Sequence, residues 1–102
     1  MRVETTPFTL CKRYPLTISR GTSASTTNLL VRIEHDAIQG IGEMAPMTFG
    51  ERQEDAVTGA RELGSLAEAL ADIAPWEMQR MEALIAWADV GPAARCALDM
   101  AL

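Results

Sequence analysis

Strand-like and helix-like patterns occupy separate parts of this sequence, and the change between them falls near Pro46. Before it, in "TTNLLVRIEHD", Leu29, Val31 and Ile33 recur at every second position, which is the spacing of a strand with one buried face. After it, apolar residues recur every three or four positions, as in amphipathic helices. Strands followed by helices within 102 residues predict a single α+β domain.

The strand part predicts a three-stranded antiparallel meander. Its first strand lies in "VETTPFTLCKRY", where Pro7 belongs at an edge or a bulge because proline cannot donate to a ladder. A polar turn around His35 and Asp36 leads to the third strand, "IQGIGEM". Glycines spaced in this way are typical of a strand whose backbone is approached closely by another element.

Capping signals predict where the first two helices begin. Thr48 and Glu51 stand three apart before an amphipathic run, and Ser65 and Glu68 repeat this spacing before "LAEALA". We therefore expect a helix after Thr48 and a brief second helix after Ser65. The residues expected on the buried face of the first are Ala56, Val57, Ala60 and Leu63.

Two prolines mark the last two helices of the predicted helical bundle. A third helix is expected to start at Pro75, and a fourth at Pro92, directly after Gly91. The apolar stripe of the third consists of Met78, Met81, Leu84, Ile85 and Ala88. In "GPAARCALDMAL" only Arg95 and Asp99 carry charge, so this helix is expected to be covered on nearly every side.

Composition excludes several classes of function. The net charge of −5 and the scattered basic residues argue against a nucleic-acid-binding face. No signal peptide and no membrane-spanning run is recognised, and two cysteines are too few for a disulfide framework. We expect a cytoplasmic protein that binds neither nucleic acid nor membrane.

Residues able to carry chemistry are few. His35 has no second ligand at metal-binding spacing and is interpreted as a turn residue. Cys11 is expected to fill a strand position and Cys96 to act as a small hydrophobe on its helix. Glu43, at the end of a glycine-rich strand, either faces solvent or organises a neighbouring loop. We predict no catalytic residue and no metal ligand in this chain.

Two predicted connections between elements are more distinctive in composition than a small domain requires. Residues Ile18–Thr26, "ISRGTSAST", are expected to form a long loop between two strands, and Met44–Glu51, "MAPMTFGE", a loop between the last strand and the first helix. Loops that leave one rigid layer often carry recognition residues.

Three segments of the sequence resemble a known family. "LLVRI", the G-x-G-E-x-x-P pattern of "GIGEMAP" and the closing "AARCALDMAL" are similar to the N-terminal capping domain of the enolase superfamily. The similarity extends over essentially the whole chain. Within the superfamily it is greatest for the muconate-lactonizing branch, and there for the dipeptide epimerases typified by L-Ala-D/L-Glu epimerase.

The resemblance implies an isomerase, a racemase or epimerase, in which this chain is inactive alone. Residues 1–91 would be the capping domain and 92–102 the start of a helix leading into a TIM-type barrel that the chain lacks. That barrel would hold Mg²⁺ and the lysines that exchange the α-proton of a dipeptide or other carboxylate, with enediolate stabilisation by the metal. Partners would be this barrel and a small-molecule substrate, with a homo-oligomer left open.

By the same resemblance, the loop Ile18–Thr26 folds over the barrel mouth and meets the substrate, and the loop Pro46–Glu51 packs beside it, so that water is excluded. Relatives acting on Ala-Glu often place an arginine where this chain has Gly21, one position after Arg20. The residues expected to bind substrate are Ser19, Arg20, Gly21, Thr22, Ser23 and Phe49.

Other functions stay open at this point. A muconate cycloisomerase or an o-succinylbenzoate synthase would share this capping domain. A protein of another class, a self-contained α+β interaction module, would instead dock its apolar last helix into its own core or against a second copy.

Overall fold

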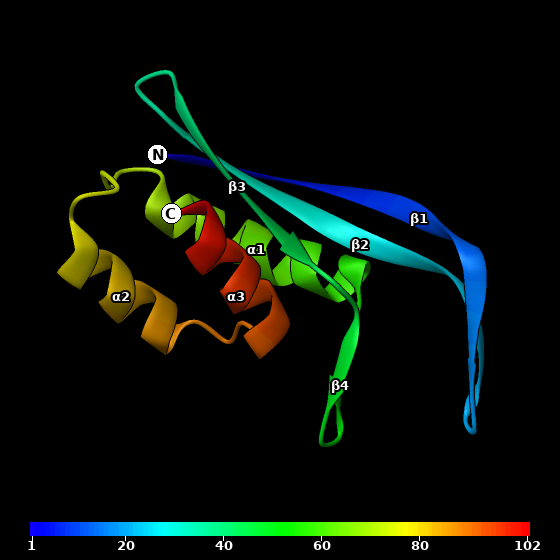
Figure 1. Ribbon diagram of the computed structural model, residues 1–102. Helices are drawn as coiled ribbons and strands as arrows, with labels where there is room; N and C mark the ends of the chain where they lie inside the picture. Colours follow the sequence, from blue (N-terminus) through cyan, green and yellow to red (C-terminus); the bar gives the residue numbers. More distant parts are fainter.

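The computed structural model describes residues 1–102 and shows a sheet with helices on one side (Figure 1). The strands come first in the chain and the helices last, which confirms the predicted α+β class. The elements are β1 (Arg2–Ile18), β2 (Gly21–His35), β3 (Ile38–Met44), β4 (Met47–Phe49), β5 (Arg52–Glu54), α1 (Ala56–Leu70), α2 (Met78–Trp87) and α3 (Pro92–Ala101).

The predicted meander is confirmed. β1, β2 and β3 pair antiparallel in that order, so Pro7 lies on an edge strand, opposite Leu29. Two residues, Asp36 and Ala37, join β2 to β3, and both have positive φ, 49° and 62°. This backbone conformation suits a two-residue hairpin because its twist matches that of the strands.

The first connection is not the long loop predicted for Ile18–Thr26. Ile18 ends β1 and pairs with Gly21, so only Ser19 and Arg20 form the turn. The small polar residues that suggested a loop continue β2 instead. The register shifts between Cys11 and Leu16, and beyond this irregularity the two strands bend away from the sheet as a ribbon (Figure 1).

The core lies between the sheet and the helices. Leu29, Val31 and Ile33 are all at most 3% exposed, as their alternation predicted. The other members of the core are Met1, Met44, Ala56, Leu63, Leu66, Leu70, Ile73, Met81, Ile85, Ala94, Ala97, Leu98 and Ala101.

Helix α1 is a single helix that begins later than predicted. Asp55, not Thr48, caps it, because an Asp55 side-chain oxygen accepts a hydrogen bond from the Thr58 N–H at 2.7 Å. Ser65 does not start a second helix, and its hydroxyl donates to the Arg61 carbonyl one turn earlier. Val57 is exposed rather than buried, since the buried stripe passes through Gly59.

Helix α2 begins at Met78, three residues after the expected Pro75. Glu77 accepts a hydrogen bond from the Ala74 N–H at 3.0 Å, and this bond lowers the pKa of its carboxyl group, with Arg80 adding to the effect. Met81 is buried as predicted, but Met78 is exposed because it lies at the very start of the helix.

Helix α3 begins at Pro92 as predicted, with Gly91 as its N-cap. It is not covered on every side: one face packs on β3, while Cys96 and Met100 are exposed on the other. None of the three helices has the length and apolar character that a membrane-spanning helix requires.

Candidate functional site

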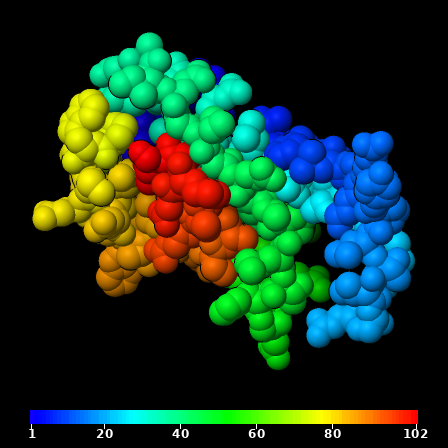
Figure 2. Space-filling view, viewed as in Figure 1, coloured from blue at the N-terminus to red at the C-terminus, as the bar shows by residue number.

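Two hairpins project in the same direction from one end of the sheet (Figure 1). One is the far part of β1 and β2, and the other is formed by β4 and β5, which pair with each other. The space-filling view shows open space between the two tips (Figure 2). The exposed tips and the space between them are the candidate functional site.

Five of the six predicted substrate-binding residues meet at the first tip. Ser19 and Arg20 form the turn, and Gly21, with φ 136°, opens β2. Thr22 pairs with Thr17, their hydroxyl oxygens 3.0 Å apart. All of these side chains except Ser23 are exposed.

The first hairpin is also basic. Lys12 donates to the hydroxyl of Ser23 at 2.9 Å, and the Arg13 guanidinium lies 5.5 Å from the centre of the Tyr14 ring. Residues 5–31 contain three basic residues, Lys12, Arg13 and Arg20, and no acidic residue, although the whole chain has a net charge of −5. The positive charge of this hairpin favours an anionic ligand.

The second tip replaces the loop that was predicted for Met44–Glu51. Met47–Phe49 and Arg52–Glu54 form a hairpin whose turn contains Gly50, with φ 60°. Phe49, the sixth predicted residue, is 67% exposed at the end of β4. It faces a hollow of about 440 Å³ that is also lined by Met47, Ala93 and Cys96.

The structure therefore does not unite all six predicted residues. Phe49 lies on a different hairpin from the other five, and no hydrogen bond or ion pair joins the two hairpins. A ligand touching both tips would have to lie in the open space between them (Figure 2).

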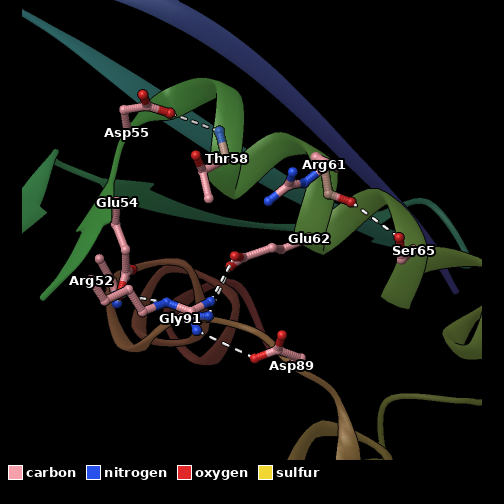
Figure 3. Close-up of polar contacts among 10 residues, drawn as sticks. Arg52, Glu54, Asp55, Thr58, Arg61, Glu62, Ser65, Asp89 and Gly91 are labelled. Carbon is pink, nitrogen blue, oxygen red and sulfur yellow. Dashed lines mark hydrogen bonds and ion pairs between the residues drawn. The ribbon is translucent and has the colours of Figure 1, made fainter.

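A charged cluster at the base of the second hairpin was not predicted (Figure 3). Arg52 on β5 forms an ion pair with Glu62 on α1 at 2.6 Å and with Asp89 at 3.3 Å, and its Nε lies 3.6 Å from Glu54 Oε1. The hydrogen bond to Asp89, followed by the charges of Glu62 and the other acidic partners, raises the pKa of Arg52. The guanidinium therefore stays charged.

The same cluster caps α3. Glu54 accepts a hydrogen bond from the Ala93 N–H and Glu62 from the Gly91 N–H, both at 2.8 Å. A Cβ at Gly91 would come within 2.6 Å of the Glu54 carboxylate oxygens, so a larger residue here would displace this carboxylate. One signal was present in the sequence: glycine at an N-cap has no side-chain acceptor, so the first N–H groups of this helix need acceptors from elsewhere.

Two other residues singled out from the sequence have structural contacts. The His35 ring packs edge-on against Trp76, with centroids 4.8 Å apart, and lies 3.4 Å from an Asp36 carboxylate oxygen. Glu43 accepts a hydrogen bond from the side-chain amide of Asn28 at 2.5 Å. No group of three or more His, Cys, Asp or Glu residues is placed to hold a metal ion.

The fold matches solved structures of the enolase superfamily. The L-Ala-D/L-Glu epimerase of Bacillus subtilis, solved as a substrate-liganded complex, is 22% identical with a TM-score of 0.84, over 99% of this chain and 29% of that chain. The dipeptide epimerase of Enterococcus faecalis, complexed with Mg and L-Leu-L-Tyr, is 24% identical with a TM-score of 0.80, over 98% and 28%.

A third match is the muconate lactonizing enzyme of Mycobacterium smegmatis, complexed with muconolactone. It is 25% identical with a TM-score of 0.80, over 97% of this chain and 27% of that chain. No protein-family model and no curated protein matches the sequence.

This chain thus has the capping-domain fold of the enolase superfamily, as its sequence predicted. The similar structures include two epimerases, a muconate lactonizing enzyme and a mandelate racemase/muconate lactonizing protein from Herpetosiphon aurantiacus. The chain spans less than a third of the length of each of these proteins.

Proposed function

We propose that this chain is the specificity and closure domain of a Mg²⁺-dependent dipeptide epimerase that acts by α-proton abstraction. The observation that supports this most is the pair of exposed hairpin tips projecting from one end of the sheet, in a fold shared with two dipeptide epimerases (Figure 1). The tips would close over a substrate bound to the rest of the enzyme and exclude water from it.

The substrate would be a dipeptide or another small carboxylate. Arg20 at the first tip and the basic residues behind it would attract the negative charge. Phe49 at the second tip would supply an apolar contact to the substrate side chain.

The residues of this chain do not fit a magnesium site, because no three potential ligands lie together. We therefore assign Mg²⁺, the acid and the base to a barrel domain elsewhere in the polypeptide. The whole enzyme would work in the cytoplasm.

The proposal is tested first on the coding sequence that follows Leu102. It is expected to encode a barrel with a Lys-x-Lys strand followed by three strands ending in acidic residues. A stop codon directly after Leu102 would contradict the proposal and would favour a self-contained interaction module.

The second test is catalytic and uses the whole polypeptide with L-Ala-L-Glu in D₂O. We expect incorporation of deuterium at the α-carbon that depends on Mg²⁺, and none with the 102-residue chain alone. Turnover of muconate or of an o-succinylbenzoate precursor, without dipeptide exchange, would instead assign a cycloisomerase or synthase. The muconate lactonizing enzyme of Mycobacterium smegmatis has a similar fold.

A further inference from the structure

The β4–β5 hairpin is too short to hold its own position. Each strand has three residues, and an isolated two-stranded hairpin is marginally stable in water. Phe49 is nevertheless placed at its tip, beside the hollow. Something outside the hairpin must therefore fix its position.

Arg52 is the residue paired directly with Phe49 across the hairpin. Its side chain reaches back from the tip to Glu62 on α1 and to Asp89, which precedes α3 (Figure 3). Because the backbones of a cross-strand pair are held side by side, a tether on Arg52 also restrains Phe49.

Glu54 supplies the second attachment. Its side chain is 1% exposed, although it belongs to an otherwise exposed hairpin, and one of its oxygens accepts from the Ala93 N–H in the first turn of α3. A carboxylate at a helix N-terminus is stabilised by both the free N–H groups and the helix dipole. The hairpin is thus joined to the helix that forms the other wall of the hollow.

We propose that Arg52 and Glu54 are positioning residues that fix the β4–β5 hairpin, and with it Phe49, against the N-terminus of α3. Neither residue contacts substrate in this account. The catalytic consequence rests on the function proposed above, whereas the structural restraint does not depend on it.

The restraint is tested by NMR on the 102-residue chain. In Glu54→Ala, hydrogen exchange at the Ala93 amide should accelerate about 10-fold or more relative to Gly91, whose acceptor is Glu62. In Arg52→Gln, the heteronuclear NOE of the Phe49 amide should fall while those of α1 stay unchanged. Unchanged values at both amides would overturn the proposal.

Matched controls come from the exposed face of α1. Arg61→Gln and Glu68→Gln remove the same charges from side chains that make no ion pair. In both controls, hydrogen exchange at the Ala93 amide and the heteronuclear NOE of the Phe49 amide should equal the wild-type values. If either control lowered the heteronuclear NOE of the Phe49 amide as much as Arg52→Gln does, a general effect of charge loss, and not the ion pairs of Arg52, would explain the result.

The catalytic consequence is tested by kinetics on the whole polypeptide. A displacement of ~1 Å can cost about 100-fold in rate, so Arg52→Gln should lower kcat/KM for a dipeptide about 10- to 100-fold, mainly through KM, with partial rescue in Arg52→Lys. Loss in kcat alone, or no loss, would overturn the positioning role. If the wild-type polypeptide lacked isomerase activity, the proposed function would fail while the NMR result stood.

Discussion

The carbonyl group of Ala97 on α3 occupies the space that a side chain at Gly42 on β3 would need. A Cβ built on Gly42 would overlap the Ala97 oxygen and would lie 2.8 Å from its carbonyl carbon. Gly40 meets Ala101 in the same way one turn further along α3. The two glycines, two residues apart, let a helix of small residues pack directly on the strand.

Replacing Gly42 by alanine is therefore expected to separate α3 from the sheet. We expect Gly42→Ala to lower the free energy of unfolding by about 1–3 kcal/mol, because a backbone atom cannot move aside as a flexible side chain can. Urea denaturation monitored by circular dichroism measures this. Gly64→Ala on α1, where a Cβ meets nothing within 4 Å, should instead raise stability by about 0.5–1 kcal/mol. Equal effects at the two sites would show that contact with α3 does not matter.

The turn between β2 and β3 contains a strained alanine. Ala37 has φ 62°, a conformation that disfavours any residue with a Cβ. Ala37→Gly is expected to raise the free energy of unfolding by about 0.5–1 kcal/mol. The same substitution at Ala69, on the exposed face of α1, should lower it by about 1 kcal/mol. A loss of stability in Ala37→Gly would contradict the left-handed turn.

The cap of α1 should make stability depend on pH in acid. The hydrogen bond from the Thr58 N–H lowers the pKa of Asp55, so this carboxylate stabilises the fold above its unfolded pKa of about 4. The contribution is lost as the pH falls through the lower folded pKa. Asp55→Asn keeps a side-chain acceptor but should flatten the fall of Tm below about pH 4.

The control for this titration is Asp99→Asn, on the exposed side of α3, where the carboxylate accepts no hydrogen bond. It measures the effect of losing one surface carboxylate that caps no helix. An identical curve for Asp55→Asn would mean that the cap does not titrate as described.

Patterns that extend over several residues predicted the fold correctly. The alternation through Leu29, Val31 and Ile33 placed a buried strand, and the glycines of "IQGIGEM" indicated the close approach that α3 makes. Gly91 and Pro92 located the start of the last helix to the residue. In each case the local pattern and the tertiary packing require the same residues.

Predictions that rested on short sequence signals were wrong. Thr48 and Glu51 match a capping box, but they lie on the β4–β5 hairpin, and Asp55 caps the helix instead. Strands of three residues leave no periodicity to detect. The charged cluster could not be predicted because Arg52 and Glu62 come together only after the hairpin has folded against α1.

The sequence predicted only part of the candidate site. Adjacent residues such as Ser19 and Arg20 necessarily stay together, whereas the place of Phe49 depends on a hairpin that the sequence did not reveal. Whether these residues bind substrate stays a prediction.

The kinetic effect of Phe49→Ala in the whole polypeptide shows whether the hairpin tips bind substrate. Because substrate would cover the exposed Phe49 ring in the whole enzyme, loss of this contact should cost about 1.5–3 kcal/mol, so KM for a dipeptide should rise about 10- to 100-fold. Ile38→Ala removes an apolar side chain that is also exposed, at the β2–β3 turn at the opposite end of the sheet, and should change nothing (Figure 1). Unchanged kinetics in both variants would contradict the assignment of the hairpin tips to substrate binding.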